Sequence, residues 1–139
     1  MKIFLDANVL IAVLNKEYPV FTYASRVLSL TGRKNVELFT SPVCLAIAFY
    51  FAEKKSGTIK AKEKIALLVS KISIADTGKR AVHATLKNKS VNDFEDGLEY
   101  YSALQAGCTH FITEDKSDFY FAAIPVTNSE EFLKKHFMP

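Results

Sequence analysis

The chain has 139 residues, of which 49% are hydrophobic, and 18 Lys and Arg against 15 Asp and Glu give it a net charge of +3. This length suits a single domain over residues 1–139 with one core. No apolar run approaches the roughly 20 residues of a membrane span, and Asp6 interrupts the first apolar stretch too early for a signal peptide. We therefore expect a cytoplasmic protein outside the membrane. Cys44 and Cys108 lie in apolar surroundings, so we expect two buried, reduced thiols.

Strands are predicted to alternate with helices along the whole chain. The first half is predicted to contain a strand at 2–6, helices at 7–14 and 19–31, a strand at 36–40, and helices at 43–55 and 58–70. The second half is predicted to contain a strand at 72–75, a helix at 77–86, a helix from 92 or 93 to 105, strands at 109–113 and 124–126, and a helix at 129–137. A short polar turn is expected around 117–119. This alternation is typical of an α/β protein with a mostly parallel sheet.

Two of the helices differ in their predicted burial. The helix at 43–55 is apolar nearly all round, so we expect it to be deeply packed. The helix at 58–70 is amphipathic, and its pattern predicts lysines in solvent and four apolar residues facing inward, namely Ile59, Ile65, Leu68 and Val69.

Carboxylates follow two of the predicted strands directly. Asp6 ends the first strand, and Asp115 and Asp118 follow the strand that ends at Thr113. Ligands of open parallel sheets bind outside the carboxyl ends of the strands, so these acids are expected at one edge. Clustered carboxylates repel one another and usually need a cation or shared protons. Helix capping is the alternative for Asp6, and a polar turn is the alternative for the later acids.

A third acidic segment opens the helix that ends near residue 105. Asp93 and Asp96 are three residues apart and share one helix face, where they can serve a site or simply cap the helix and complement its dipole. Glu95 and Glu99 are expected on another face, in solvent. Thr113 can hold a carboxylate through its hydroxyl group.

Charge is distributed unevenly along the chain. Residues 54–89 carry ten Lys and Arg against two acids, whereas residues 90–118 carry seven acids against one Lys. A basic segment beside a carboxylate cluster suits a polyanion brought to a metal site, although a solvated helix face explains the lysines equally well. The candidates for contact with a phosphate backbone are Lys54, Lys55, Lys60, Lys62 and Lys64.

Several segments resemble the motifs of the PIN domain family, in the same order and at similar spacing. They are IFLDANVL at 3–10, SPVCLA at 41–46, DFEDGL at 93–98, ALQAGC at 103–108 and FITEDKSDF at 111–119. The resemblance implies an α/β/α sandwich with a mostly parallel central sheet and metal-dependent cleavage of RNA. Many small bacterial members resemble VapC-type toxins, which implies an antitoxin partner, and a homodimer is a further partner to consider.

The resemblance also implies a set of site residues. Asp6, Asp96, Asp115 and Asp118 would be the catalytic acids that bind Mg²⁺ or Mn²⁺, and Asp93 is a candidate addition on the Asp96 face. Asn8 and Thr113 would support the site.

One position departs from the family pattern. A glutamate usually follows the Leu-Ala of the second motif, and this chain has Ile47 there. Glu53 lies about 120° around the helix from Ile47 and cannot simply replace that glutamate. The alternative to an active ribonuclease is therefore a weakened or inactive PIN module that binds RNA or a protein. A phosphotransferase using Asp6 as nucleophile is disfavoured, since Asn8 stands where a second acid is needed.

Overall fold

Five parallel strands form the central sheet, in the order β3-β2-β1-β4-β5. The computed structural model describes residues 1–138. The strands are β1 (Lys2–Leu5), β2 (Glu37–Thr40), β3 (Ser73–Ile74), β4 (His110–Ile112) and β5 (Val126–Thr127). All four strand pairings are parallel, so the predicted α/β class with a mostly parallel sheet is confirmed.

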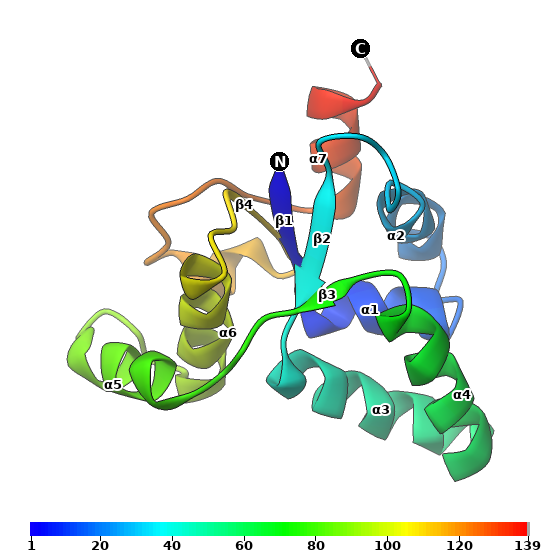
Figure 1. Cartoon of the computed structure of the whole chain (residues 1–139), viewed down its shortest axis with the longest axis horizontal. Helices are drawn as coiled ribbons and strands as arrows, with labels where there is room; N and C mark the ends of the chain where they lie inside the picture. The colour runs from blue at the N-terminus through cyan, green and yellow to red at the C-terminus, as the bar shows by residue number, and fades with distance from the viewer. Residues whose placement is uncertain (139) are drawn as a thin grey trace.

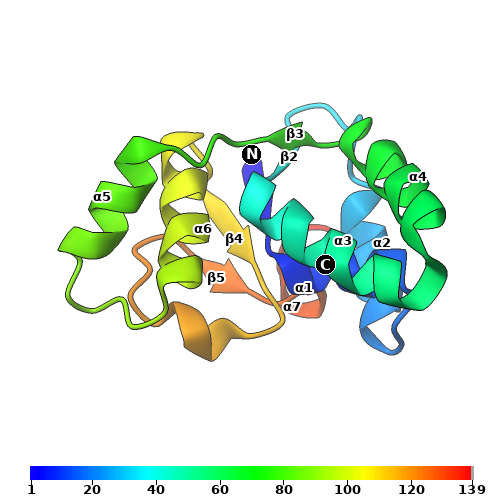
Figure 2. The same ribbon diagram turned by 90° about the horizontal axis from the view of Figure 1, so that it is seen from below.

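Helices cover both faces of this sheet (Figures 1 and 2). They are α1 (Ala7–Leu14), α2 (Val20–Leu28), α3 (Pro42–Ser56), α4 (Thr58–Val69), α5 (Lys79–Lys87), α6 (Phe94–Gln105) and α7 (Ser129–His136), with a 3₁₀ turn η1 at Lys116–Phe119. In Figure 1, α5 and α6 lie on one side of the strands and α1 and α2 on the other, while α3 runs past their carboxyl ends. This arrangement is the predicted α/β/α sandwich.

The centre of the sheet explains the continuous apolar run at the start of the chain. Ile3, Phe4 and Leu5 of β1 are almost completely buried, because β1 has a neighbouring strand on each side and helices above and below. Leu5 of β1 lies opposite Ile112 of β4. The next residues along each strand, Asp6 and Thr113, therefore leave the sheet at the same level.

Local signals set the ends of several helices as predicted. Ser41 caps α3 by accepting a hydrogen bond from the Cys44 amide at 3.3 Å, and Pro42 occupies the first turn, where its missing N–H costs nothing. Asp93 caps α6 through the Glu95 and Asp96 amides. Both cysteines, Cys44 and Cys108, are free and buried, as expected.

Two predictions of helix burial are wrong. Helix α3 is not deeply packed, since Tyr50 is 51% exposed and Phe51 is also open to solvent. Packing against α1, α4 and α6 buries only a narrow stripe of small residues on α3 and leaves its outer face free. Ile59 does not face inward either and is 77% exposed, because it lies in the first turn of α4, at the rim of the molecule. Within residues 1–138, no helix has the length and apolar character needed to cross a membrane.

Candidate metal-binding site

Asp6 lies where the chain passes from β1 into α1, and both of its carboxylate oxygens are engaged. Oδ1 accepts a hydrogen bond from the Ala7 amide at 2.6 Å and thereby caps α1. Oδ2 accepts one from the Thr113 hydroxyl at 2.7 Å. The side chain is only 6% exposed. The capping role weighed for Asp6 is therefore real, but it occupies one oxygen and leaves the carboxylate at the edge of the sheet.

Thr113 connects three segments at this edge. Its buried hydroxyl donates to Asp6 and accepts hydrogen bonds from Asn8 Nδ2 and from the Asp115 amide, both at 3.1 Å. Asn8 Oδ1 in turn accepts from the Glu114 amide at 3.1 Å. Asn8 and Thr113 thus tie the first turn of α1 to the loop after β4, and they fix the direction of the Asp6 carboxylate.

A small cavity of about 170 Å³ lies beside Asp6 at the carboxyl end of the sheet. Its lining includes acids from the end of β1, from α6 and from the segment after β4. All four acids predicted to form the site are among them. The lining residues are Asp6, Ala7, Asn8, Ile11, Ile47, Glu95, Asp96, Glu99, Asp115 and Asp118. None of these residues carries a positive charge, so the cavity is strongly electronegative.

The crowding of carboxylates is evident at Asp96, in the first turn of α6. Burial raises the pKa of Asp96 from 3.8 to about 7, with further contributions from the nearby acids Asp93, Asp118, Asp6 and Glu95. A positive charge in the cavity would therefore favour the ionised form of Asp96. Oxygen donors gathered in this way suit a hard divalent cation such as Mg²⁺ or Mn²⁺, so the residues present fit the metal that was predicted.

Asp93 and Glu53 lie outside the cavity. Asp93 Oδ1 caps α6 at 2.9 Å from the Glu95 amide, and Asp93 is exposed, so it fits the capping role rather than that of an additional ligand. Glu53 Oε2 accepts a hydrogen bond from Thr58 at 2.7 Å, at the junction of α3 and α4. Ile47 lines the cavity wall and brings no oxygen to it.

The sequence reasoning was wrong about Glu99. This residue is 1% exposed rather than solvated, and it lines the cavity. Burial and the adjacent Asp6 carboxylate raise the pKa of Glu99 well above its ordinary range. The signal was available, because Asp96 and Glu99 have the same three-residue spacing that placed Asp93 and Asp96 on one face of the helix.

Cys44 lies close to two acids of the cavity, Asp6 and Glu99. Its Sγ is 4.0 Å from Asp6 Oδ1, and Sγ and the nearest carboxyl oxygens of Asp6 and Glu99 all lie within 4.8 Å of one another. Burial, with the charges of Glu99 and Asp6, raises the pKa of the Cys44 thiol well above 9.0. Metals bind the thiolate rather than the thiol, so the oxygen atoms are the ligands that this cavity offers.

The five lysines predicted to contact RNA differ in their surroundings. Lys55 donates to the Asn15 carbonyl, and Lys64 donates to the Leu14 carbonyl at 3.1 Å and to Ser56 at 3.0 Å. These two amines therefore join α3 and α4 to the end of α1. Lys54 lies over the Tyr50 ring at 4.8 Å, whereas Lys60 and Lys62 are exposed.

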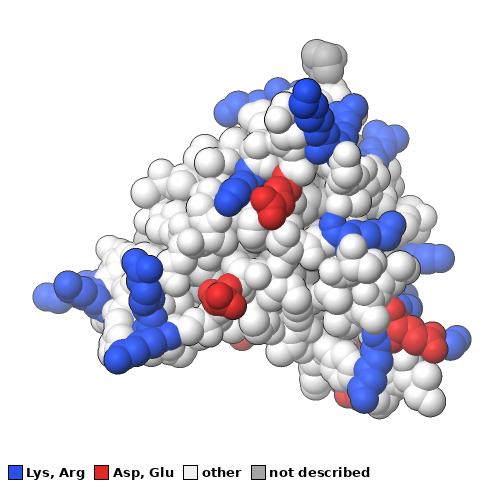
Figure 3. All heavy atoms as spheres, in the orientation of Figure 1, with Lys and Arg blue, Asp and Glu red and all other residues white. Residues whose placement is uncertain are grey.

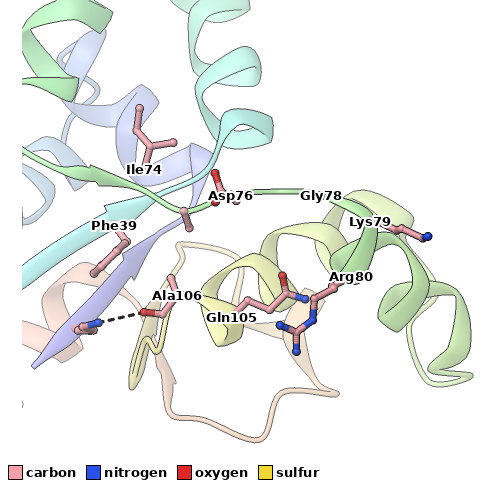
Figure 4. A pocket seen from close by; sticks show the side chains of 10 residues that line it. Phe39, Ile74, Asp76, Gly78, Lys79, Arg80, Gln105 and Ala106 are labelled. Atoms are coloured by element: carbon pink, nitrogen blue, oxygen red, sulfur yellow. Dashed lines mark hydrogen bonds between the residues drawn. The ribbon is translucent and has the colours of Figure 1, made fainter.

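A larger cavity, of about 500 Å³, lies elsewhere on the molecule, between the β2–β3 edge, the start of α5 and the end of α6. Figure 4 shows its lining, with Phe39 and Ile74 beside the strands, Arg80 close to Gln105, and the hydrogen bond from Lys2 Nζ to the Ala106 carbonyl. Asp76 is the only acid among its lining residues. This cavity contains none of the predicted site residues and has no comparable cluster of carboxylates.

The chain is similar in sequence to one known ribonuclease and in fold to solved structures, in each case over nearly its full length. It is 28% identical over 138 residues to Ribonuclease VapC1 of Aquifex aeolicus (strain VF5), covering 96% of this chain and 94% of that protein. Its fold matches solved structures at 17% identity. One is VapBC-1 from nontypeable Haemophilus influenzae, with a TM-score of 0.72 and coverage of 94% of this chain and 99% of that one. Another is VapBC2 from Rickettsia felis bound to a promoter DNA fragment, with a TM-score of 0.71 and coverage of 92% and 98%.

The family itself follows from the sequence. The PIN domain model matches residues 2–117, which contain Asp6, Asp96 and Asp115 of the cavity and both strands, β1 and β4, that lead into it. The chain therefore belongs to the PIN domain family.

Proposed function

We propose that this protein is a metal-dependent endoribonuclease of the VapC type. The observation that carries the proposal is the convergence of Asp6, Asp96, Asp115 and Asp118 on one cavity that contains no positive side chain. The similarity to Ribonuclease VapC1 over almost the whole chain supports ribonuclease chemistry.

The central proposed ligand, Asp6, is held in place before any cation binds. Asp6 is fixed by Thr113 and the start of α1, and Asp96 faces it from the first turn of α6. Bound there, Mg²⁺ or Mn²⁺ would lower the pKa of a ligated water and stabilise negative charge on the scissile phosphate. Asp115 or Asp118, on the loop side of the cavity, would accept a hydrogen bond from the attacking water and orient it.

We further propose a protein partner of the antitoxin type. Support comes from two of the solved neighbours, VapBC-1 of Haemophilus influenzae and VapBC2 of Rickettsia felis, the second of which is bound to promoter DNA. A partner that restrains the toxin would be encoded beside it. Coexpression with the adjacent short gene, followed by size-exclusion chromatography, tests this point, and separate elution of the two chains would contradict it.

The activity is tested with purified protein and a labelled structured RNA, in EDTA and with Mg²⁺ or Mn²⁺ added. We expect cleavage only with metal, and its loss in Asp6→Asn purified side by side. Asparagine retains an oxygen that can cap α1, so circular dichroism should show an unchanged fold. Cleavage that persists in EDTA or in the variant would contradict the proposal. Binding of RNA without cleavage under all conditions would favour the inactive module instead.

A further inference from the structure

Glu99 is the one acid of the cavity that is almost completely buried and still has a free oxygen. It is 1% exposed, and its Oε2 has no hydrogen-bond partner among the described residues. It lies on α6 one turn after Asp96, and the two side chains line the same cavity. The other acid of this helix that lines the cavity, Glu95, is exposed at the rim.

Such a placement is costly for a carboxyl group. A buried polar oxygen without a partner destabilises the fold, and a buried unpaired charge destabilises it more. No Lys, Arg or His lines the cavity, so no side chain there offsets the charge of Glu99. Its nearest carboxyl neighbour is Asp6, which can share a proton with Glu99 but brings no positive charge.

Two residues that α1 and α3 contribute to the cavity wall have side chains without an oxygen atom. Ile11 and Ile47 are both apolar. Further protein ligands for a cation beside Asp6 must therefore come from the rest of the lining, where Asp96 and Glu99 lie on consecutive turns of α6. Two carboxyl groups three residues apart on one helix face can reach the same ion.

We propose that Glu99 is a metal ligand of this cavity and that its free carboxyl oxygen completes, with Asp6 and Asp96, an oxygen site for Mg²⁺ or Mn²⁺. This inference deepens the proposed function and rests on it. It assigns to α6 a carboxylate that α3 does not supply at Ile47.

The test is Mn²⁺ binding without RNA, measured by calorimetry and by the electron paramagnetic resonance signal of free Mn²⁺. Glu99→Gln preserves the size of the side chain but removes its charge, and we expect its affinity for Mn²⁺ to fall at least about tenfold. Glu99→Asp retains a carboxylate, so its affinity should lie between those of Glu99→Gln and the native chain. The matched control is Glu95→Gln, on the same helix, whose exposed and screened charge should matter much less.

Three results would overturn the assignment. The first is native affinity in Glu99→Gln. The second is equal weakening in Glu99→Gln and Glu99→Asp, which would indicate packing rather than ligation. The third is a Glu99→Gln chain that is unfolded in EDTA, which would make Glu99 a structural residue, whereas we expect this chain to be at least as stable as the native one.

The inference and the proposed function can fail separately. If the native chain binds Mn²⁺ and Asp6→Asn does not, while Glu99→Gln binds normally, only the role of Glu99 is wrong. If the native chain binds no Mn²⁺ at all, the metal-dependent function fails and the assignment of Glu99 fails with it.

Discussion

The hydroxyl group of Thr113 holds one of the two carboxylate oxygens of Asp6. It donates to Asp6 and accepts from Asn8 and from the Asp115 amide, so one oxygen atom joins three segments around the cavity. Thr40 occupies a similar place at the end of β2, on the other side of β1, and donates to the Leu5 carbonyl at 3.0 Å. The two threonines are equally buried but only Thr113 touches the acids.

This contrast gives a prediction for Thr113→Val. The valine has the same shape but leaves Asn8 and the Asp115 amide without their acceptor, so we expect a loss of about 1–3 kcal/mol in the free energy of unfolding. We also expect weaker Mn²⁺ binding, because Asp6 is no longer held. Thr40→Val should lose about 1 kcal/mol and bind Mn²⁺ normally. Denaturant unfolding and calorimetry provide both readouts, and equal Mn²⁺ affinity in the two variants would argue against a role for Thr113 in positioning Asp6.

Asp96 gives a prediction for the metal-free protein. Its pKa in the fold is about 7 against an ordinary 3.8. Below pH 4 the group is protonated in both the folded and unfolded states and costs nothing. As the pH rises towards 7 the unfolded chain loses the proton first, so folding becomes less favourable. Asp96→Asn removes this effect.

In EDTA, the gain in Tm of Asp96→Asn over the native chain should therefore be larger at pH 7.5 than at pH 5, by up to a few degrees. Partial exposure of Asp96 screens the charge and keeps the effect small. Added Mn²⁺ should raise the Tm of the native chain but not that of the variant. A gain in Tm that does not change with pH would contradict this account.

The positions of the acids could be predicted from the sequence more accurately than their surroundings could. We could predict that four acids lie close together, namely Asp6, Asp96, Asp115 and Asp118. Strand ends and helix starts are visible as local sequence patterns, and the carboxyl ends of parallel strands lie at one edge of the sheet. The burial of Glu99 depends on how far α6 leans over the end of β1, which is a matter of tertiary packing. For the same reason, the hydrogen bonds of Lys55 and Lys64 could not be inferred from a row of lysines.

At the scale of elements, the position of α6 depends on its contact with α5. Gly97 lies next to Asp96, and a Cβ atom there would be 2.3 Å from Thr85 Cγ2 and 2.9 Å from Val91 Cγ1. Only a glycine permits so close an approach of α6 to the end of α5 and the segment that follows. Asp96 and Glu99, two of the three acids that α6 brings to the cavity, are thus positioned by the contact of this helix with α5.

Gly97→Ala should therefore disturb both stability and the site. The added methyl group collides with the buried side chain of Thr85, and overpacking of this kind costs about 1–3 kcal/mol. We also expect weaker Mn²⁺ binding, since α6 must move. Gly78→Ala is the control, because nothing lies within 4 Å of a Cβ atom at that position. If Gly97→Ala were as stable as Gly78→Ala, the close packing of α5 against α6 would not limit the position of Asp96.

The predicted order of elements is confirmed along the whole chain, whereas the surfaces of α3 and α4 were misjudged. Local sequence signals predicted the helix caps Ser41 and Asp93 and the apolar strands correctly, because these features depend little on tertiary packing. The apolar face of α3 gave no indication of its exposure, since composition does not reveal whether another element will cover a helix. Tyr50 and Phe51 are exposed because no other helix or strand of residues 1–138 covers this face of α3.

At the scale of the whole molecule, the acidic cavity and several basic helices lie in different places. The acids of the cavity gather at the carboxyl end of the sheet. On the face drawn in Figure 3, Lys and Arg side chains lie over outer helices, at α5 on one edge and around α2 and α4 on the other. A chain of RNA that crosses the cavity would reach such cations on either side, and they would offset repulsion between its phosphates and the acids.

Within the predicted set, Lys60 and Lys62 on α4 are exposed and form no hydrogen bond or ion pair with residues 1–138, unlike Lys55 and Lys64. Their replacement therefore tests the RNA path without damaging the fold. Lys60→Gln with Lys62→Gln should weaken RNA binding and flatten its dependence on salt by up to about one unit of slope for each lost phosphate contact. The matched control removes the same charge from Lys34 and Lys135, which are exposed near the amino end of the sheet, away from the cavity. Filter binding at several salt concentrations, with metal omitted to prevent cleavage, measures both quantities. The two double variants could instead lose the same RNA affinity and the same salt dependence. The effect of the α4 lysines would then be one of net charge alone, and the RNA would run along another part of the surface. Helix α5 would be the next basic element to examine.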